Sequence, residues 1–373
     1  MGTSTMGWLG KAVLASGLLL SACGSDSNSA ATTAAGTNGA TPSSSSSVPD
    51  SSAATTTMAD GMSMRTQYPL TIVGCGGQSV TFDKAPETIV SLDPQAYELL
   101  FWVGVGERQL AAGPMPLPAV PEPFKDASQT VTTIAASTGE ISQEALLAAK
   151  PDFVIGSYDY VFSGDGVYTE QELADKGIAT YWSLGKGGCM SDDADAPRTD
   201  LEGTFRDLEN LGKIFDKQEE AMALVASLRA DLATAVASVD STTKLRVATA
   251  NIGELTEGAP GYYGSASAVN AIITLAGGVN VFGDLPDAYA TTTLEELVKR
   301  DPEVIMVIGY PFSVPEDWDQ AEAFLTSNPA LANISAVKNQ RFVRVVFPEV
   351  GAGGVRNVDG VKKLAAELAS TTG

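Results

Sequence analysis

Aromatic, carboxylate and thiol side chains supply most of the candidate chemistry of this sequence, because it contains no histidine. Histidine is the usual zinc ligand, the usual general base near neutral pH and a member of every serine-histidine triad. Its absence argues against those kinds of site. We therefore expect a binding protein with no catalytic residue and no protein-bound metal.

Aromatic side chains follow the ends of predicted strands in both halves of the chain. In open α/β sheets, ligands bind beyond the carboxyl ends of the strands. These aromatics predict a cleft for a flat, partly apolar ligand, with an arginine available to an anionic group. Interior packing is the alternative for about half of them, since aromatics near strand ends often complete a core. The predicted ligand-binding residues are Tyr158, Tyr160, Phe162, Trp182, Tyr262, Tyr263, Tyr310, Phe312 and Arg356.

Two glutamates, Glu144 and Glu295, occupy matching positions in two similar segments. Each follows a Ser or Thr by two residues and precedes a proline by seven. This pattern predicts an exposed carboxylate at the start of an equivalent helix in each half. The helix dipole or a capping box explains each glutamate taken alone, but neither explains the repetition.

A targeting segment is predicted over residues 1–22. Lys11 precedes an apolar run from Ala12 to Leu20, which matches a signal-peptide core and is too short to span a bilayer as a mature helix. The run leads into Leu-Ser-Ala-Cys, which resembles the lipobox of bacterial lipoproteins. We expect Cys23 to be lipidated and to anchor the protein at the extracytoplasmic face of the cell membrane. An ordinary secretory signal and a start at Met6 are the alternatives.

The other two cysteines, Cys75 and Cys189, lie in Gly-rich stretches of the first half. Exported proteins occupy compartments in which disulfides persist. We predict that these cysteines form a disulfide, because they are the only two left once Cys23 is acylated. In the chain-entropy model, closing so long a loop is nominally worth about 4 to 5 kcal/mol.

Composition separates a tether from a folded part. Residues 23–64 are mostly Ser, Thr, Ala and Gly, so they have little to bury and are predicted to be disordered. The remainder exceeds what one core normally holds, which predicts an N-terminal α/β lobe over 65–215, an interlobe helix over 216–239 and a C-terminal α/β lobe over 240–373. The chain has 45 acidic and 23 basic residues, and its net charge of -22 disfavours binding to nucleic acid or anionic membranes.

Strands and helices alternate in both lobes, which predicts mainly parallel sheets. A small hairpin is predicted over 69–82. The predicted strands are 88–92, 109–113, 152–157, 178–184, 244–250, 303–310 and 341–347. The predicted helices are 94–103, 144–150, 169–176, 199–215, 267–275, 293–299 and 358–369.

The stretch 216–239 predicts one long amphipathic helix with a single apolar stripe. At about 1.5 Å per residue it would run roughly 35 Å, which is enough to bridge two small domains. Packing on the sheet of one domain is the alternative. The predicted stripe is Ala221, Leu224, Val225, Leu228, Leu232, Val236 and Val239.

Several segments, taken in order, resemble the helical-backbone class of ABC-importer substrate-binding proteins. This class includes binders of ferric siderophores, haem and cobalamin. The similarity runs from Val73 to about Ala369, and its motifs are weak individually but specific in this order. The segments are PETIVSLDPQAYELLFWVGVGERQLAAG, EALLAAKPDFVIG, LGKIFDKQEEA, YYGSASAVNAIITLAGGVNVFGD, LEELVKRDPEVIMV and QRFVRV.

The resemblance implies two Rossmann-like lobes joined by a helix, with ligand held between them and little hinge motion. It also implies that a glutamate on each lobe docks onto arginines of the permease, which carries over to Glu144 and Glu295. We therefore expect a monomer that captures a ferric siderophore, or a similar iron chelate, and delivers it to an ABC permease and its ATPase. No cofactor other than this bound Fe(III)-siderophore ligand is expected.

Alternatives remain within and outside this class. Haem and cobalamin are alternative ligands. An enzyme with Asp93 or Glu257 as acid and base, or a surface adhesin or sensor, would be a different kind of protein on the same fold. The glycines from Gly351 to Gly354 either let backbone approach the ligand or form an ordinary flexible loop.

We predict that Cys23→Ala moves the protein out of the membrane fraction, because the acyl group on this cysteine is the expected anchor. The measurement is an immunoblot of membrane and soluble fractions from cells that make each form. A Cys23→Ala protein that still partitions wholly with membranes would contradict the lipidation.

Overall fold

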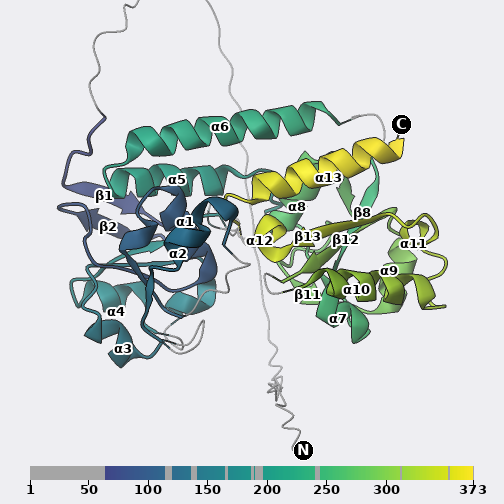
Figure 1. Cartoon of the computed structure of the whole chain (residues 1–373), viewed down its shortest axis with the longest axis horizontal. Coiled ribbons are helices and arrows are strands. Elements are labelled where there is room, and N and C mark those ends of the chain that lie inside the picture. Colours follow the sequence, from purple (N-terminus) through teal and green to yellow (C-terminus); the bar gives the residue numbers. More distant parts are fainter. Residues whose placement is uncertain are drawn as a thin grey trace, which may run out of the picture. The chain divides into compact units, whose positions relative to one another are not determined.

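A computed structural model describes residues 64–113, 120–135, 141–163, 167–185, 189, 196–239, 244–310, 313–351 and 353–372. All of these belong to one compact unit, Gly61–Gly373. The unit contains two parallel β-sheets with helices packed on them, which is the α/β architecture that the alternation predicts (Figure 1). No helix within the described ranges is both long and apolar enough to cross a membrane.

The N-terminal lobe, residues 64–215, is built on a five-stranded sheet with the order β5-β4-β3-β6-β7. Every neighbouring pair in this sheet is parallel. A separate antiparallel hairpin of β1 and β2 confirms the hairpin expected over 69–82. The strands are β1 Leu70–Val73, β2 Ser79–Phe82, β3 Ile89–Ser91, β4 Gln109–Ala111, β5 Thr132–Thr133, β6 Phe153–Gly156 and β7 Ala179–Trp182. The helices are α1 Pro94–Trp102, η1 Gly106–Arg108, η3 Glu122–Phe124, α2 Lys125–Ser128, α3 Gln143–Ala148, η4 Asp159–Phe162, α4 Glu170–Ala174 and α5 Glu202–Ile214.

The C-terminal lobe, residues 244–372, is built on a four-stranded parallel sheet with the order β10-β8-β12-β13. A short antiparallel pair, β9 with β11, is formed by the stretch of chain between β8 and β12. The strands are β8 Arg246–Asn251, β9 Gly261–Tyr262, β10 Val279–Asn280, β11 Ala290–Thr291, β12 Val304–Gly309 and β13 Phe342–Val346. The helices are α7 Ile252–Thr256, α8 Ala268–Leu275, α9 Leu294–Arg300, α10 Pro315–Ser327, α11 Ser335–Lys338, α12 Phe347–Val350 and α13 Asn357–Thr372.

A long helix, α6 Gln218–Ala237, packs on α5 along one part of its length and on α13 along another (Figure 1). It therefore contacts both lobes, as expected of a helix that joins them. A single connected set of buried apolar side chains includes residues of both sheets and of α6. One residue of the predicted stripe is wrong: Val236 is 40% exposed, and its neighbour Ala235 is buried instead.

The two segments that carry Glu144 and Glu295 have the same local structure. The Ser142 hydroxyl accepts from Ala145 N (3.1 Å) at the start of α3, and the Thr293 hydroxyl accepts from Glu296 N (3.3 Å) at the start of α9. Each segment then reaches a left-handed residue immediately before its proline: Lys150 has φ 49° and Asp301 has φ 42°. A left-handed residue ends a helix, and the residue before a proline avoids helical backbone.

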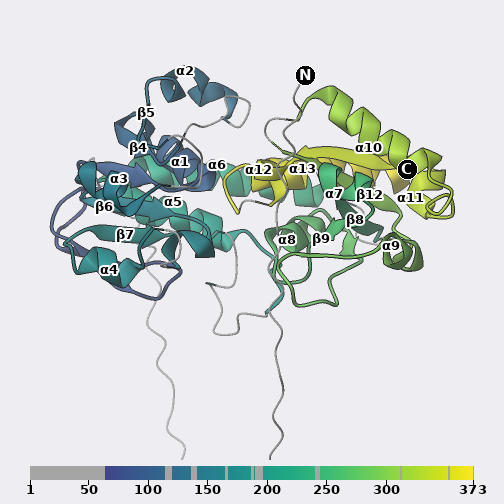
Figure 2. The ribbon, with the colours of Figure 1, turned by 90° about the horizontal axis from the view of Figure 1, so that it is seen from below.

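The longest helix that the sequence patterns above leave out is α10. It packs against α7 and β12 (Figure 2). The sequence does carry the residues typical of a helix N-terminus, since Pro315, Glu316 and Asp317 form the first turn of α10. Its buried side chains, Trp318, Ala321 and Leu325, are spaced as on one helical face.

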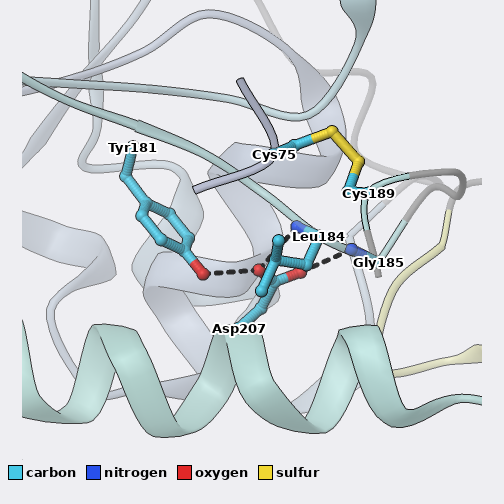
Figure 3. The surroundings of a disulfide bond; sticks show 6 residues. All are labelled: Cys75, Tyr181, Leu184, Gly185, Cys189 and Asp207. Atoms are coloured by element: carbon cyan, nitrogen blue, oxygen red, sulfur yellow. Dashed lines mark hydrogen bonds between the residues drawn. A yellow bond between two sulfur atoms is a disulfide. The ribbon is translucent and has the colours of Figure 1, made fainter. Parts of the chain in front are cut away.

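The structure joins Cys75 to Cys189 in a disulfide near the end of β7 (Figure 3). Cys75 N also donates to Trp182 O (2.8 Å), and this hydrogen bond attaches the β1–β2 hairpin to β7, the edge strand of the sheet. Beside it, Asp207 of α5 accepts from Tyr181 Oη (2.7 Å), Leu184 N (2.7 Å) and Gly185 N (2.8 Å). Desolvation raises the pKa of Asp207 to about 7, although the hydrogen bonds from these three donors act to lower it.

We predict that Asp207 makes stability fall as pH rises from about 4 to about 7. In that window the folded protein holds a proton that the unfolded chain has released, so the free energy of unfolding decreases by up to about 1.4 kcal/mol per pH unit from this group. Urea unfolding of wild type and Asp207→Asn should show wild type losing stability relative to the variant across this window, with no further change above it.

Tyr181→Phe is the matched control, because it removes one donor to Asp207 and keeps the carboxylate. Its pH dependence should resemble that of wild type. A constant difference between wild type and Asp207→Asn at every pH would contradict the raised pKa.

Candidate functional site

The candidate site lies where strands of both lobes end. Tyr158 follows β6, Asn251 is the last residue of β8, Tyr310 follows β12 and Phe347 follows β13. These four residues line one cavity of about 470 Å³, within the usual range for small-molecule sites. The cavity therefore lies beyond the carboxyl ends of parallel strands, which is where ligands bind in open α/β sheets. Its other lining residues are Glu254, Tyr263, Ser267, Ala268, Asp287, Ala288, Tyr289 and Gly351.

Aromatic rings form much of the cavity wall. Tyr263 packs on Tyr289 with ring centroids 5.1 Å apart, and Tyr310 lies 6.1 Å from Phe347. Tyr158 stacks on Tyr160 at 5.5 Å with an interplanar angle of 18°. Because Tyr289 and Tyr310 are 42% and 36% exposed, their rings offer apolar faces to a ligand.

A carboxylate, Glu254, is held at the wall by two neutral donors. Its Oε2 accepts from Asn251 Nδ2 (2.9 Å), and its Oε1 accepts from Tyr289 Oη. The backbone of Gly261 closes in behind these groups: a Cβ there would lie 2.2 Å from Glu254 Oε2 and 2.6 Å from Tyr289 Oη. A glycine at 261 is therefore required for the carboxylate and the phenol to sit where they do.

The phenol groups of the cavity are protonated near neutral pH. Desolvation raises the pKa of Tyr263, and desolvation followed by the hydrogen bond to Glu254 raises the pKa of Tyr289. The pKa values of Tyr310 and Tyr158 are raised for the same first reason. Near neutral pH these groups are therefore O–H donors, and their rings present apolar faces.

The structure brings three predicted binding residues, Tyr158, Tyr263 and Tyr310, to the cavity. Phe162 is buried in the N-terminal lobe against Trp182, with ring centroids 5.8 Å apart. Neither of these two is among the described lining residues of the cavity.

Two further predicted residues also lie off the described lining. Tyr262 is buried against Phe282 at 4.7 Å, although its hydroxyl donates to the lining residue Asp287 (2.8 Å). Tyr160 is 51% exposed and stacks on the lining residue Tyr158. Phe312 and Cys23 lie outside the described residues.

Arg356, predicted to face an anionic group, forms an ion pair with Glu98 of α1. Its Nη2 lies 2.6 Å from Glu98 Oε2 and its Nε 3.1 Å from Oε1. The two side chains are only 12% and 7% exposed. Nearby, Gly353 O accepts from Thr204 Oγ1 (3.1 Å) of α5. The segment before α13 is therefore attached to two helices of the N-terminal lobe.

The alternative acid and base residues do not form a catalytic pair in the structure. Asp93 is buried and accepts from Gln95 N (3.0 Å), Ala96 N (2.9 Å) and Ser157 N (2.6 Å), so its carboxylate connects α1 to the end of β6. Glu257 is exposed after α7 and is not among the described lining residues. Within the described residues, no cluster of three or more acidic or cysteine side chains is placed to hold a metal ion.

Nine of the twelve described lining residues are not among the predicted binding residues, and five of these nine carry a carboxylate, an amide or an aromatic ring. Asn251 and Glu254 had a detectable signal, since Asn251 directly follows the predicted strand 244–250 and Glu254 lies about one helical turn later, at the same edge of the sheet. Phe347 is the last residue of the predicted strand 341–347 and directly follows the observed β13, so it satisfies the same rule. Asp287 and Tyr289 lie between β10 and β11, where no periodic pattern indicates which side chains face the site.

Comparisons with known proteins agree on one family. Residues 89–346 match the family described as periplasmic binding protein. The chain is 23% identical over 304 residues to the uncharacterized ABC transporter substrate-binding lipoprotein YvrC of Bacillus subtilis, covering 81% of this chain and 86% of that one. It is also 23% identical over 247 residues to the vitamin B12-binding protein of Vibrio campbellii, covering 66% and 78%.

Solved structures match in the same way. A protein of an ABC-type Fe3+-hydroxamate transport system from Saccharomonospora viridis has a TM-score of 0.66 at 25% identity, covering 81% of this chain and 99% of that one. A periplasmic binding protein from Veillonella parvula has a TM-score of 0.67 at 23% identity, covering 81% and 97%. The haem-binding protein BhuT in complex with two haems has a TM-score of 0.57 at 20% identity, covering 78% and 100%.

We predict that Arg356→Met lowers the free energy of unfolding by about 3 to 5 kcal/mol, because it leaves the Glu98 carboxylate buried without its partner. Glu98→Gln combined with Arg356→Met removes both charges and should restore much of that loss. Urea unfolding measures both effects.

Lys84→Met is the control, since the Lys84–Glu87 pair is 69% and 70% exposed. Exposed pairs contribute less than about 1 kcal/mol. Equal effects of Arg356→Met and Lys84→Met would show that the buried pair does not hold the two elements together.

Proposed function

Because this chain belongs to the periplasmic binding protein family, we propose that it captures a ferric siderophore, or a similar bulky iron chelate, outside the membrane and delivers it to an ABC permease. Its relatives are ABC transporter substrate-binding proteins, which work with a permease and an ATPase. The observation that carries the proposal is the tyrosine-walled cavity at the strand ends. In this proposal the ligand is transported and not transformed.

Iron would enter this cavity already coordinated by its chelator. Tyrosine binds Fe(III) as a phenolate, whereas burial raises the pKa values of Tyr263 and Tyr289. The described residues also provide no acidic or cysteine cluster for a bare ion. The rings of Tyr289 and Tyr310 would instead cover the organic surface of a chelate.

Docking to the permease would use the two matched glutamates. Glu144 and Glu295 are both exposed at the second position of their helices, α3 and α9. A backbone donor and Thr293 lower the pKa of Glu295, which keeps its carboxylate charged. One carboxylate on each lobe would pair with permease arginines, which bind carboxylates in a bidentate manner.

The remaining elements of the proposal concern location and assembly. The protein would act as a monomer at the extracytoplasmic face of the cell membrane. A lipid on Cys23 would anchor it through the segment 23–64, and no other membrane contact is required. One curated relative, from Bacillus subtilis, is itself named a lipoprotein.

The proposed function is tested by a ligand panel with purified protein, followed by native mass spectrometry and calorimetry. The panel contains ferric hydroxamate, catecholate and carboxylate chelates, haem and cobalamin, because relatives are named for binding vitamin B12 as well. We expect a ferric chelate to bind in a one-to-one complex. If only cobalamin or haem binds, the proposed ligand is wrong and the transport role stands. If the bound ligand is chemically turned over, the transport role is wrong.

Tyr310→Ala links the binding to the cavity. Loss of one aromatic contact is worth about 0.5 to 1.5 kcal/mol, so affinity should fall roughly two- to tenfold. Val314→Ala, an exposed apolar residue outside the described lining, should leave affinity unchanged. Equal affinity of the Tyr310→Ala protein would place the ligand elsewhere.

We predict that Glu144→Lys with Glu295→Lys abolishes uptake while ligand affinity and thermal stability stay nearly intact. The helix dipole stabilises each exposed glutamate only weakly, whereas a lysine opposite a permease arginine is a like-charge contact that costs several kcal/mol. Uptake of radiolabelled iron chelate by cells and melting of the purified variant are the measurements.

The matched control is Glu107→Lys with Glu219→Lys, which makes the same change in charge at two other exposed glutamates. Uptake should survive in this control. Normal uptake by the Glu144/Glu295 variant, or loss of ligand binding in the purified protein, would assign these carboxylates another role.

A further inference from the structure

Among the described lining residues of the cavity, every charged side chain is negative. Glu254 and Asp287 contribute carboxylates, and the other lining residues carry no charge at neutral pH. Arg356, which the sequence predicts in the site, is outside the described lining and forms an ion pair with Glu98. A ligand that enters this cavity therefore meets two carboxylates and no compensating cation from the described wall.

Glu254 is fixed in place before any ligand arrives. Each of its oxygens accepts one hydrogen bond, from Asn251 Nδ2 and from Tyr289 Oη, and the absent side chain of Gly261 leaves room for both. A carboxylate oxygen can accept about two hydrogen bonds, so each still has capacity to accept from a ligand. A preorganised acceptor of this kind binds an ammonium or N–H group without first having to be ordered.

The charge of Glu254 reaches the surrounding phenols. It contributes, after desolvation, to the raised pKa values of Tyr263, Tyr289 and Tyr310. Asp287 lies on the same wall, where its Oδ2 accepts from Tyr262 Oη (2.8 Å). The cavity thus combines neutral O–H donors with two fixed negative charges, and like charge placed against them disfavours binding.

We propose that this cavity selects neutral to cationic chelates that carry an ammonium or N–H groups, which Glu254 receives, and excludes polyanionic ones. This inference rests on the proposed function and specifies its substrate class. Fe(III) bound by three hydroxamates is neutral in its coordination sphere, and a terminal ammonium makes the complex a cation. A ferric tris-catecholate is a trianion and haem carries two propionates, so both would place negative charge against Glu254 and Asp287.

A matched ligand series tests the inference. One linear ferric trihydroxamate is used in three forms that differ at one terminal nitrogen: the free ammonium, the neutral N-acetyl form and the anionic N-succinyl form. Calorimetry with wild type should give affinities in that order, with a spread between the ends on the order of tenfold or more.

Variants assign the effect to its residue. Glu254→Gln keeps the shape and an acceptor but removes the charge, so the spread should shrink to within about twofold. Asp287→Asn should reduce it by a smaller factor, because Asp287 is more exposed. Glu257→Gln is the control: it removes a nearby charge outside the described lining and should leave the order and the spread intact.

The outcomes separate the two proposals. If all three forms bind equally to wild type, or if the anionic form binds best, charge selection is wrong while chelate capture stands. If the spread persists in Glu254→Gln and in Asp287→Asn, these carboxylates do not cause it and the inference is overturned. If no form and no other iron chelate binds, the proposed function fails and the inference fails with it.

Discussion

The apolar contact of α6 with both lobes is the constraint on which the rest of the structure depends. One connected core includes side chains of both sheets and of α6. The residues of α6 that belong to this core or pack against it are Leu224, Val225, Leu228, Leu232 and Ala235, and Val239 follows just beyond the helix. Residues at these positions lie on one side of a helix with 3.6 residues per turn. Ala235 falls within this stripe and Val236 at its edge, so Ala235 is buried whereas Val236 is 40% exposed.

Since α6 packs on α5 at one part and on α13 at another, it leaves the strand ends to form the site. Parallel strands end at a common edge, so residues at or just after the ends of β6, β8, β12 and β13 contribute to one cavity. The Glu98–Arg356 pair supports this arrangement at a second point, between α1 and the start of α13. A helix packed along both lobes and a buried ion pair between them favour small rearrangements on binding over a wide hinge opening.

The strands and longer helices were predictable because they are periodic and end in clear signals. Phe153–Gly156 is a buried apolar run, and α3 and α9 begin with capping residues and stop before prolines. The site was only partly predictable, because strand-end position does not determine side-chain direction. Tyr262 and Tyr263 are adjacent, yet the first packs in a core against Phe282 and the second faces the cavity. Neighbouring residues of extended backbone point to opposite sides, so at most one of such a pair faces a given cavity.

The carboxylates show why residue type alone does not reveal a role. Asp93 and Asp207 are buried among backbone N–H donors, so they connect elements and are inaccessible to ligand. Glu98 is buried against an arginine, which joins two parts of the chain. Glu254 differs from Glu98 because its partners are neutral, and from Asp93 and Asp207 because it lines the cavity. A carboxylate with neutral partners keeps its field, since no cation cancels it, and a cavity of low polarity screens that field less than water does. Among the described residues, Glu254 and Asp287 therefore place two carboxylates without a cation partner at the cavity wall, where a ligand's own charge has most effect on affinity.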